Sequence, residues 1–230
     1  MKTMLTGAAA VATMLLALPA TAQTVDLGTG PGFAIDDSDA GDGYGVFVST
    51  FDVAAGSAQD VVPDSISVTL TELKHTWMGD LVAFLVHDPG TPDDDSDDVF
   101  QTLFYAVSPN GQLVGDASDF DGNYTFEDSA TASLWDAAAA LDGTQAVPSG
   151  SYFPGDSTND DPPAEVRVSL DDVFAGSSTA GTWALVVYDL EPSFDTGSLG
   201  SFTVTASVVP EPASALLLAP FGLGLIRRRR

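Results

Sequence analysis

Turn-forming residues interrupt this chain about every ten residues, and this spacing limits the possible fold more than any other feature. The runs between the interruptions are rich in Val, Ile, Thr, Phe and Tyr, as β-strands are. In residues 65–73 the alternation is regular, with Ile66, Val68 and Leu70 on one face and Ser67, Thr69 and Thr71 on the other. The pattern predicts a chain of short, half-buried strands.

The expected elements are mostly strands. They cover residues 44–53, 65–73, 80–88, 99–107, 123–126, 165–170, 182–189 and 198–209. Residues 80–88 are apolar on both faces, which is typical of a central strand, and only residues 133–141 have helical composition. Trp77 and Trp183 are expected to fill the space between two sheets. The sequence therefore predicts an all-β fold, an antiparallel β-sandwich or jelly roll with one short helix.

Residues 1–22 have the layout of a secretory signal peptide. Lys2 supplies the positive charge, Ala8 to Leu18 form the apolar segment, and Ala20-Thr21-Ala22 form the cleavage site. We expect the chain to be exported, and residues 23–209 to form its one domain.

The chain ends with an apolar segment, Ala213 to Ile226, followed by four arginines. As a helix this segment would span about 21 Å, against a hydrocarbon core of about 30 Å, and arginine side chains that reach the headgroups would reduce the difference. The arginines should hold this end on the cytoplasmic side. We expect residues 213–226 to anchor the chain transiently in the inner membrane.

The Pro210-Glu211-Pro212 motif, the apolar segment and the arginine cluster together resemble the PEP-CTERM sorting signal. That signal belongs to exported proteins of Gram-negative bacteria that make exopolysaccharide. The resemblance implies that residues 210–230 are a sorting tail processed by an exosortase-type enzyme. It also implies delivery to the cell surface or the extracellular matrix, where exopolysaccharide or surface components would be the partners.

The expected domain is strongly acidic. Residues 23–209 hold 32 of the 33 acidic residues but only Lys74 and Arg167 among the basic ones, so their formal charge is −30. Repulsion excludes nucleic acid and anionic membranes as partners. The chain has no Cys, so disulfides, thiolate catalysis and cysteine metal sites are excluded as well.

Four blocks of sequence resemble the P domain, also called Homo B, which follows the protease domain in proprotein convertases and some bacterial subtilases. They are ELKHTWMGDLVAFLVHDPG (72–90), DFDGNYTFEDSA (119–130), VPSGSYFP (147–154) and AGTWALVVYDLEPSFDTGSLGSFTVT (180–205). The acidic insertion at 91–101 departs from the family pattern. The resemblance implies a jelly-roll module, here without the serine and histidine blocks of a protease.

The residues indicate no catalytic centre. We expect His75 to lie beside Trp77 at the head of a strand, as a packed, hydrogen-bonded imidazole and not a base, and His87 invites the same interpretation. No metalloprotease motif, phosphate-binding loop or nucleophile elbow occurs. Carboxylate pairs are too frequent in so acidic a chain to identify or exclude a glycosidase-type dyad.

Calcium binding is the one chemistry that the pattern favours, because Ca²⁺ takes oxygen ligands from acidic loops. The best candidate set is Asp80, Asp189 and Asp195, at positions that match the family near strand ends. The other sets are Asp93, Asp94, Asp95, Asp97 and Asp98 in the insertion, and Asp36, Asp37, Asp39 and Asp42 farther upstream. None has EF-hand spacing, and a solvated acidic surface is the alternative.

Two functions remain open. The first is a non-enzymatic, exported surface or matrix module that binds or scaffolds and is stabilised by calcium. The alternative is a carbohydrate-active enzyme or other hydrolase with a carboxylate site on the same scaffold. A concave, aromatic-lined groove with two facing carboxylates would favour the second, and a convex acidic surface the first.

Overall fold

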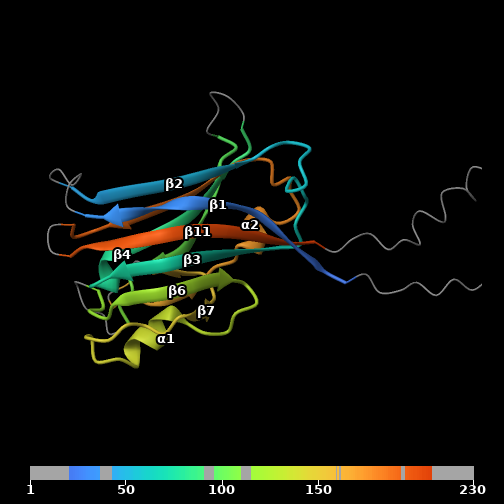
Figure 1. Ribbon diagram of the computed structural model, residues 1–230. Helices are drawn as coiled ribbons and strands as arrows, with labels where there is room; N and C mark the ends of the chain where they lie inside the picture. Colours follow the sequence, from blue (N-terminus) through green and yellow to red (C-terminus); the bar gives the residue numbers. More distant parts are fainter. Residues whose placement is uncertain are drawn as a thin grey trace, which may run out of the picture. The chain divides into compact units, whose positions relative to one another are not determined.

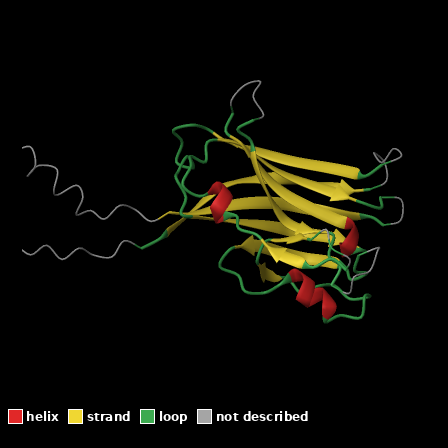
Figure 2. Ribbon diagram, turned by 180° about the vertical axis from the view of Figure 1, so that it is seen from behind, coloured by secondary structure: helices red, strands yellow, loops and turns green. Residues whose placement is uncertain are grey.

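Two sheets pack face to face in a computed structural model of the chain (Figures 1 and 2). The structure describes residues 21–36, 43–90, 96–109, 115–158, 160, 162–192 and 195–208. Gln23–Val208 form one compact unit. The predicted sorting tail, the membrane segment and all of the signal peptide except Thr21 and Ala22 lie outside the described residues.

The larger sheet has five strands in the order β1-β11-β3-β6-β7. Their bounds are β1 Gln23–Ile35, β11 Gly197–Val208, β3 Ser65–His75, β6 Phe120–Glu127 and β7 Gly150–Tyr152. The first and last strands of the unit, blue and orange in Figure 1, lie side by side. All neighbours are antiparallel except β6 and β7, which run parallel.

The smaller sheet has four antiparallel strands in the order β2-β10-β4-β5. Their bounds are β2 Gly45–Val53, β10 Gly181–Asp189, β4 Leu81–Asp88 and β5 Val99–Tyr105. A short antiparallel pair, β8 Gly155–Ser157 and β9 Glu165–Arg167, forms a small sheet of its own, and β8 lies against β5. The helical turns are η2 Met78–Asp80, α1 Leu134–Ala139 and α2 Asp171–Phe174.

The core lies between the inner faces of the two sheets, where strand alternation places every second side chain. Ile66, Val68 and Leu70 of β3 are buried, as the alternation predicts. Trp183 is also buried and stacks on His87 at 4.3 Å between ring centroids. Trp77 is only partly buried, whereas Trp135 of α1 joins the core.

The predicted all-β sandwich is confirmed. The expected helix exists as α1, whose first turn is capped by the Ser133 hydroxyl accepting from the Asp136 N–H at 2.9 Å. The expectation of one short helix was incomplete, because α2 is a second one. The strand expected over 165–170 stops at Arg167, because the chain then turns into α2.

Sequence analysis did not predict β1, because its glycines and Pro31 have turn composition. In the structure these glycines allow neighbouring side chains to pack close to the backbone of β1. A Cβ on Gly30 would lie 1.9 Å from the Phe202 ring and 2.7 Å from the Ser49 hydroxyl, so no larger residue fits. The glycines of this run therefore serve packing inside a strand.

Candidate functional site

The three predicted calcium ligands belong to one end of the sandwich. Asp80 ends η2 just before β4, and Asp189 is the last residue of β10, paired with Leu81 at the start of β4. The Leu190 N–H donates to the Asp80 carbonyl at 2.8 Å. Asp195 precedes β11, and its carboxylate accepts from the Thr76 hydroxyl at 2.6 Å. Strand register thus brings Asp80 and Asp189 together.

His75 joins this group from the opposite sheet, because it is the last residue of β3 and not, as expected, the first residue of a strand. Its Nε2 lies 3.4 Å from Asp189 Oδ2, and its Nδ1 lies 2.8 Å from the Trp77 carbonyl oxygen. His75 and Asp189 are fully buried, at 1% and 0% exposure. This contact ties the two sheets together inside the molecule.

The environment holds protons on this group. Burial raises the pKa of Asp80 to about 7, and the Asp189 charge adds to the shift, while the charge of His75 opposes it. Burial by itself would lower the pKa of His75, but the hydrogen bonds to Asp189 and Trp77 and the Asp189 charge outweigh it, so this pKa is raised. The raised pKa values mean that His75 and Asp80 keep their protons to higher pH than an ordinary imidazole and an ordinary carboxyl do.

Within the described residues, no three carboxylate or imidazole side chains have the arrangement of a metal site. Asp189 already uses one oxygen toward His75 and the other to accept from the Glu191 N–H at 3.1 Å. Calcium binding by Asp80, Asp189 and Asp195 therefore stays a prediction. Of the other predicted sets, Asp37, Asp39, Asp42, Asp93, Asp94 and Asp95 lie outside the described residues.

Both histidines are packed, hydrogen-bonded groups, as expected. His87 is buried under Trp183, with its Nε2 3.1 Å from the Ala180 carbonyl oxygen, and burial lowers its pKa. A buried imidazole cannot reach a polymeric substrate without local unfolding. Neither ring is placed as a surface base.

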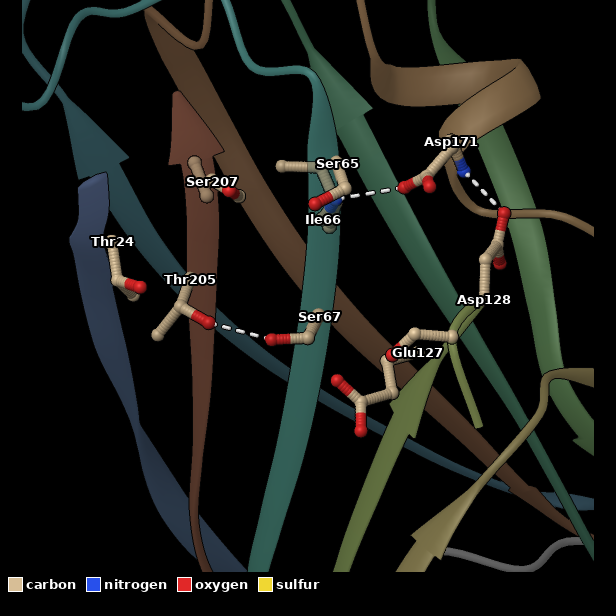
Figure 3. Close-up of a pocket in the computed structure, with 11 residues that line it drawn as sticks. Thr24, Ser65, Ile66, Ser67, Glu127, Asp128, Asp171, Thr205 and Ser207 are labelled. Atoms are coloured by element: carbon tan, nitrogen blue, oxygen red, sulfur yellow. Dashed lines mark hydrogen bonds between the residues drawn. The ribbon is translucent and has the colours of Figure 1, made fainter. Parts of the chain in front are cut away.

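A polar pocket of about 170 Å³ lies over the five-stranded sheet, at the end near α2 (Figure 3). Figure 3 shows the hydroxyls of Ser67 and Thr205 and the carboxylates of Glu127, Asp128 and Asp171 around it. Two of the carboxylates have structural partners. Asp171 accepts from the Ile66 N–H at 2.8 Å, and Asp128 accepts from the Asp171 N–H at 3.1 Å. Two of the three carboxylates around the pocket thus help to fasten α2 to the sheet.

The outer face of the four-stranded sheet is apolar, and we call this surface the apolar face. Its outward side chains include five that are at least 38% exposed, namely Tyr44, Val46, Val48, Phe100 and Tyr105. It also includes the partly exposed Phe84, Val86, Val186, Tyr188 and Leu190, with Val82 beneath them. Two shallow hollows of about 290 and 280 Å³ lie on it and share Phe84 and Tyr188.

The ring of Phe84 organises the apolar face. It meets Phe100 edge to face at 6.2 Å and Tyr188 edge to face at 6.0 Å. Sequence analysis did not identify this surface, although the signal was present in residues 80–88. These residues form an internal strand, as predicted, but Phe84 and Val86 on its second apolar side remain partly exposed on the outer surface.

No family model and no curated protein matches the sequence. Solved structures of a serine protease of Aeromonas sobria, alone and in complex with a chaperone, are similar at 15% identity and a TM-score of 0.35. The similarity covers 83% and 84% of this chain but 27% of each protease chain. This TM-score is too low to support a conclusion about family or activity. In the described residues no helix is long and apolar enough to span a bilayer.

Proposed function

We propose that this chain is an exported, non-enzymatic, P-domain-like module that binds or scaffolds at the cell surface or in the extracellular matrix. The observation that carries the proposal is the apolar face, where Phe100 and Tyr44 are 65% and 64% exposed. Exposed apolar patches of this kind mark interaction sites on soluble proteins.

The proposed location outside the cytoplasm rests on the two ends of the chain. The signal peptide predicted at 1–22 and the sorting tail predicted at 210–230 would deliver the domain outside the cytoplasm, with an exosortase-type enzyme as its processing partner. The tail supplies an apolar segment that can enter the membrane and four arginines that keep its end on the cytoplasmic side. Together they would retain the domain at the inner membrane until cleavage. Exopolysaccharide or other surface components are then the molecules that it meets.

The carboxylates and imidazoles support binding over catalysis. The two histidines are 1% and 6% exposed. In the polar pocket, Asp128 and Asp171 accept hydrogen bonds from backbone N–H groups. A hydrolase needs carboxylates that are free to face a substrate, as an acid and a base on opposite sides of the bond.

Calcium belongs to the proposal as a stabilising ion at Asp80, Asp189 and Asp195. These residues offer carboxylate oxygens, the ligand type that Ca²⁺ takes. The ion would have to displace a proton from Asp80, whose pKa is about 7. Binding should therefore strengthen above neutral pH.

Retention of the protein by polysaccharide-producing Gram-negative cells tests the proposal. The full-length chain carrying Phe100→Glu should appear in the medium in larger amounts than the wild type, because a charge on the apolar face opposes apolar contacts. Thr29→Glu is the matched control, since Thr29 is an exposed strand residue on the outer face of the other sheet.

Equal retention of both variants would refute a contact role for the apolar face. The released protein should also be screened for reducing ends formed from the secreted polysaccharide. Hydrolysis that is lost in Asp171→Asn or Asp128→Asn would support the hydrolase alternative and overturn the non-enzymatic proposal.

A further inference from the structure

We propose that the apolar face is the interface of a homodimer, in which two copies pack these faces together with their strands antiparallel. This inference rests on the proposed function, because it names the partner of the same face. The partner is a second copy of this chain. Four features of the described residues lead to it.

The first feature is the size of the exposed surface. Tyr44, Phe100 and Tyr105 are 64%, 65% and 38% exposed. With about 200 Å² for a full aromatic side chain, these three alone expose on the order of 300 Å². Val46 and Val48 add to it at 47% and 57% exposure. The apolar face thus reaches the range of about 300–600 Å² that the largest, often functional, patch of a monomer covers.

The second feature is charge. The outward positions in the middle of the sheet are Phe84 and Val86 on β4 and Ala184, Val186 and Tyr188 on β10, none of them charged at neutral pH. Both cations of the domain are placed elsewhere, Lys74 at 3.8 Å from Asp121 and Arg167 over the Phe153 ring.

The consequence concerns which partner fits. With a formal charge of −30, two copies repel each other wherever their acidic surfaces meet. A basic partner would be drawn to those acidic surfaces and not to the uncharged face, whereas repulsion between two copies is smallest when only their uncharged faces meet. A second copy brings an identical uncharged surface, which a two-fold interface requires.

The third feature is that the two ends of the apolar face complement each other. The strand register places Asp52 and Asp88 at one end, because both pair with Thr182. Tyrosine hydroxyls gather at the other end, where Tyr188 and Tyr105 both pair with Val82.

This polarity selects the antiparallel arrangement. With antiparallel strands, the tyrosine end of each copy covers the acidic end of the other, so phenol hydroxyls can donate to carboxylates. A parallel arrangement would instead bring the aspartates of both copies together. On the edge strand β2, an axis near Val48 would place Tyr44 of one copy opposite Asp52 of the other.

The fourth feature is the geometry of the rings, which favours a protein partner over a neutral glycan. The ring of Phe84 is inclined by 80° to that of Phe100 and by 88° to that of Tyr188. The three rings therefore form an uneven surface and not a flat one on which a sugar ring could stack. The outward side chains of β4 around it are aliphatic, and the hydroxyls of a sugar would lose hydrogen bonds to water there. When two sheets pack face to face, their side chains interdigitate, so an uneven apolar surface of this kind can be buried.

Sedimentation velocity of the full-length chain tests the dimer, over about 1 to 100 µM, the range of micromolar affinities. The wild type should associate to a dimer. Val48→Glu and Phe100→Glu should each weaken the dimer by about tenfold or more, because each places like charges in the interface. Thr29→Glu should dimerise as the wild type does, and circular dichroism should show that all three variants are folded.

Cross-linking tests the orientation, and the absence of Cys from the sequence makes this experiment clean. A mixture of Tyr44→Cys and Asp52→Cys chains should form mixed disulfide dimers under mild oxidation. Asp52→Cys alone should form few, because the two acidic ends lie apart. Efficient cross-linking of Asp52→Cys alone would overturn the antiparallel arrangement.

A wild type that stays monomeric at about 100 µM, or a dimer unaffected by both glutamate variants, would overturn the homodimer. Surface retention that depends on Phe100 in a monomeric protein would overturn the dimer and leave the proposed function standing. Retention that is independent of Phe100 would overturn the proposed function itself. Binding of a neutral glycan by the monomer through the apolar face would likewise overturn the dimer.

Discussion

The outer faces of the two sheets differ although both sheets enclose one core. On the five-stranded sheet, hydroxyl side chains pair across strands, as in Thr29 with Thr203 at 2.9 Å and Ser67 with Thr205 at 2.6 Å. On the four-stranded sheet, most outward positions in the middle of the sheet carry Val, Phe and Tyr, and a polar cross-strand pair, Thr182 with Asp52 at 2.7 Å, lies at one end. A strand needs only one apolar side to enter the core, so the second side is free to serve solubility on one sheet and contact on the other.

The largest effect should come from the core that both faces share. Trp183→Ala should lower the free energy of unfolding by about 3–5 kcal/mol, because it removes a buried aromatic that packs on His87 and Phe174. Urea unfolding followed by circular dichroism measures this change. Thr29→Ala, on the hydroxyl-bearing face, is the control. If Trp183→Ala costs no more than Thr29→Ala, the core is not organised around this ring.

The second-largest effect should be a pH dependence of stability, which arises at the end of the sandwich where His75 of one sheet contacts Asp189 of the other. The folded chain holds a proton on Asp80 up to about pH 7, whereas the ordinary carboxyl, with a pKa of 3.8, has already released it. The folded state therefore binds more protons between these values, and stability falls as pH rises. The raised pKa of His75 acts in the same direction, since its stabilisation is lost as pH rises through the folded-state pKa.

In metal-free buffer, the free energy of unfolding should decrease by about 2–4 kcal/mol between pH 4 and pH 8 through Asp80. Asp80→Asn should remove most of this dependence and raise the melting temperature at pH 8. Asp121→Asn, which changes an exposed carboxylate, is the matched control. A melting temperature that is equally pH-dependent in Asp80→Asn and the wild type would contradict the assignment.

A direct comparison of the two faces should give a smaller effect. Phe84→Ala should cost about 2 kcal/mol, since a half-buried ring loses two edge-to-face contacts. Thr69→Val should cost about 1 kcal/mol or less, because it removes one hydrogen bond, to Thr125, from a partly buried pair. Thermal unfolding measures both. Equal costs would mean that the apolar face contributes no more to stability than the hydroxyl-bearing face.

Calcium should have a smaller effect than the loss of the Phe84 ring. In about 0.5 M NaCl, where general screening is nearly complete, Ca²⁺ at ten times its Kd should add about 1.4 kcal/mol. The rise in melting temperature should exceed that with Mg²⁺, grow from pH 6 to pH 8, and vanish in Asp189→Asn and Asp195→Asn. Equal shifts from both ions, unchanged in these variants, would mean that the aspartates bind no specific ion.

Local patterns predicted much of the fold. The alternation over residues 65–73 correctly placed Ile66, Val68 and Leu70 inside, because a strand has a period of two that neighbouring residues reveal. Residues 133–141 correctly indicated α1. The strand β1 was missed because Gly30 has turn composition locally, while its actual reason is the ring of Phe202, far away in the sequence.

The candidate sites depended far more on tertiary structure. The resemblance to the P domain implied that Asp80 and Asp189 lie near strand ends, and the pairing of β10 with β4 brings them to the same end of the sheet. The sequence did not indicate that His75 from the other sheet reaches Asp189, or that the pKa values of His75 and Asp80 are raised there. The polar pocket also joins residues from distant strands, such as Ser67 and Thr205.

By itself, the sequence determined the β class, the inward side of its most regular strand and the acidic charge of the domain, because each follows from composition or from neighbouring residues. Only the tertiary structure decided that the second apolar side of residues 80–88 stays partly exposed and that Tyr44, Phe100 and Tyr188 extend it into one face. Alternation separates the two sides of a strand. What lies across from each side is set by the pairing and stacking of strands far apart in the chain.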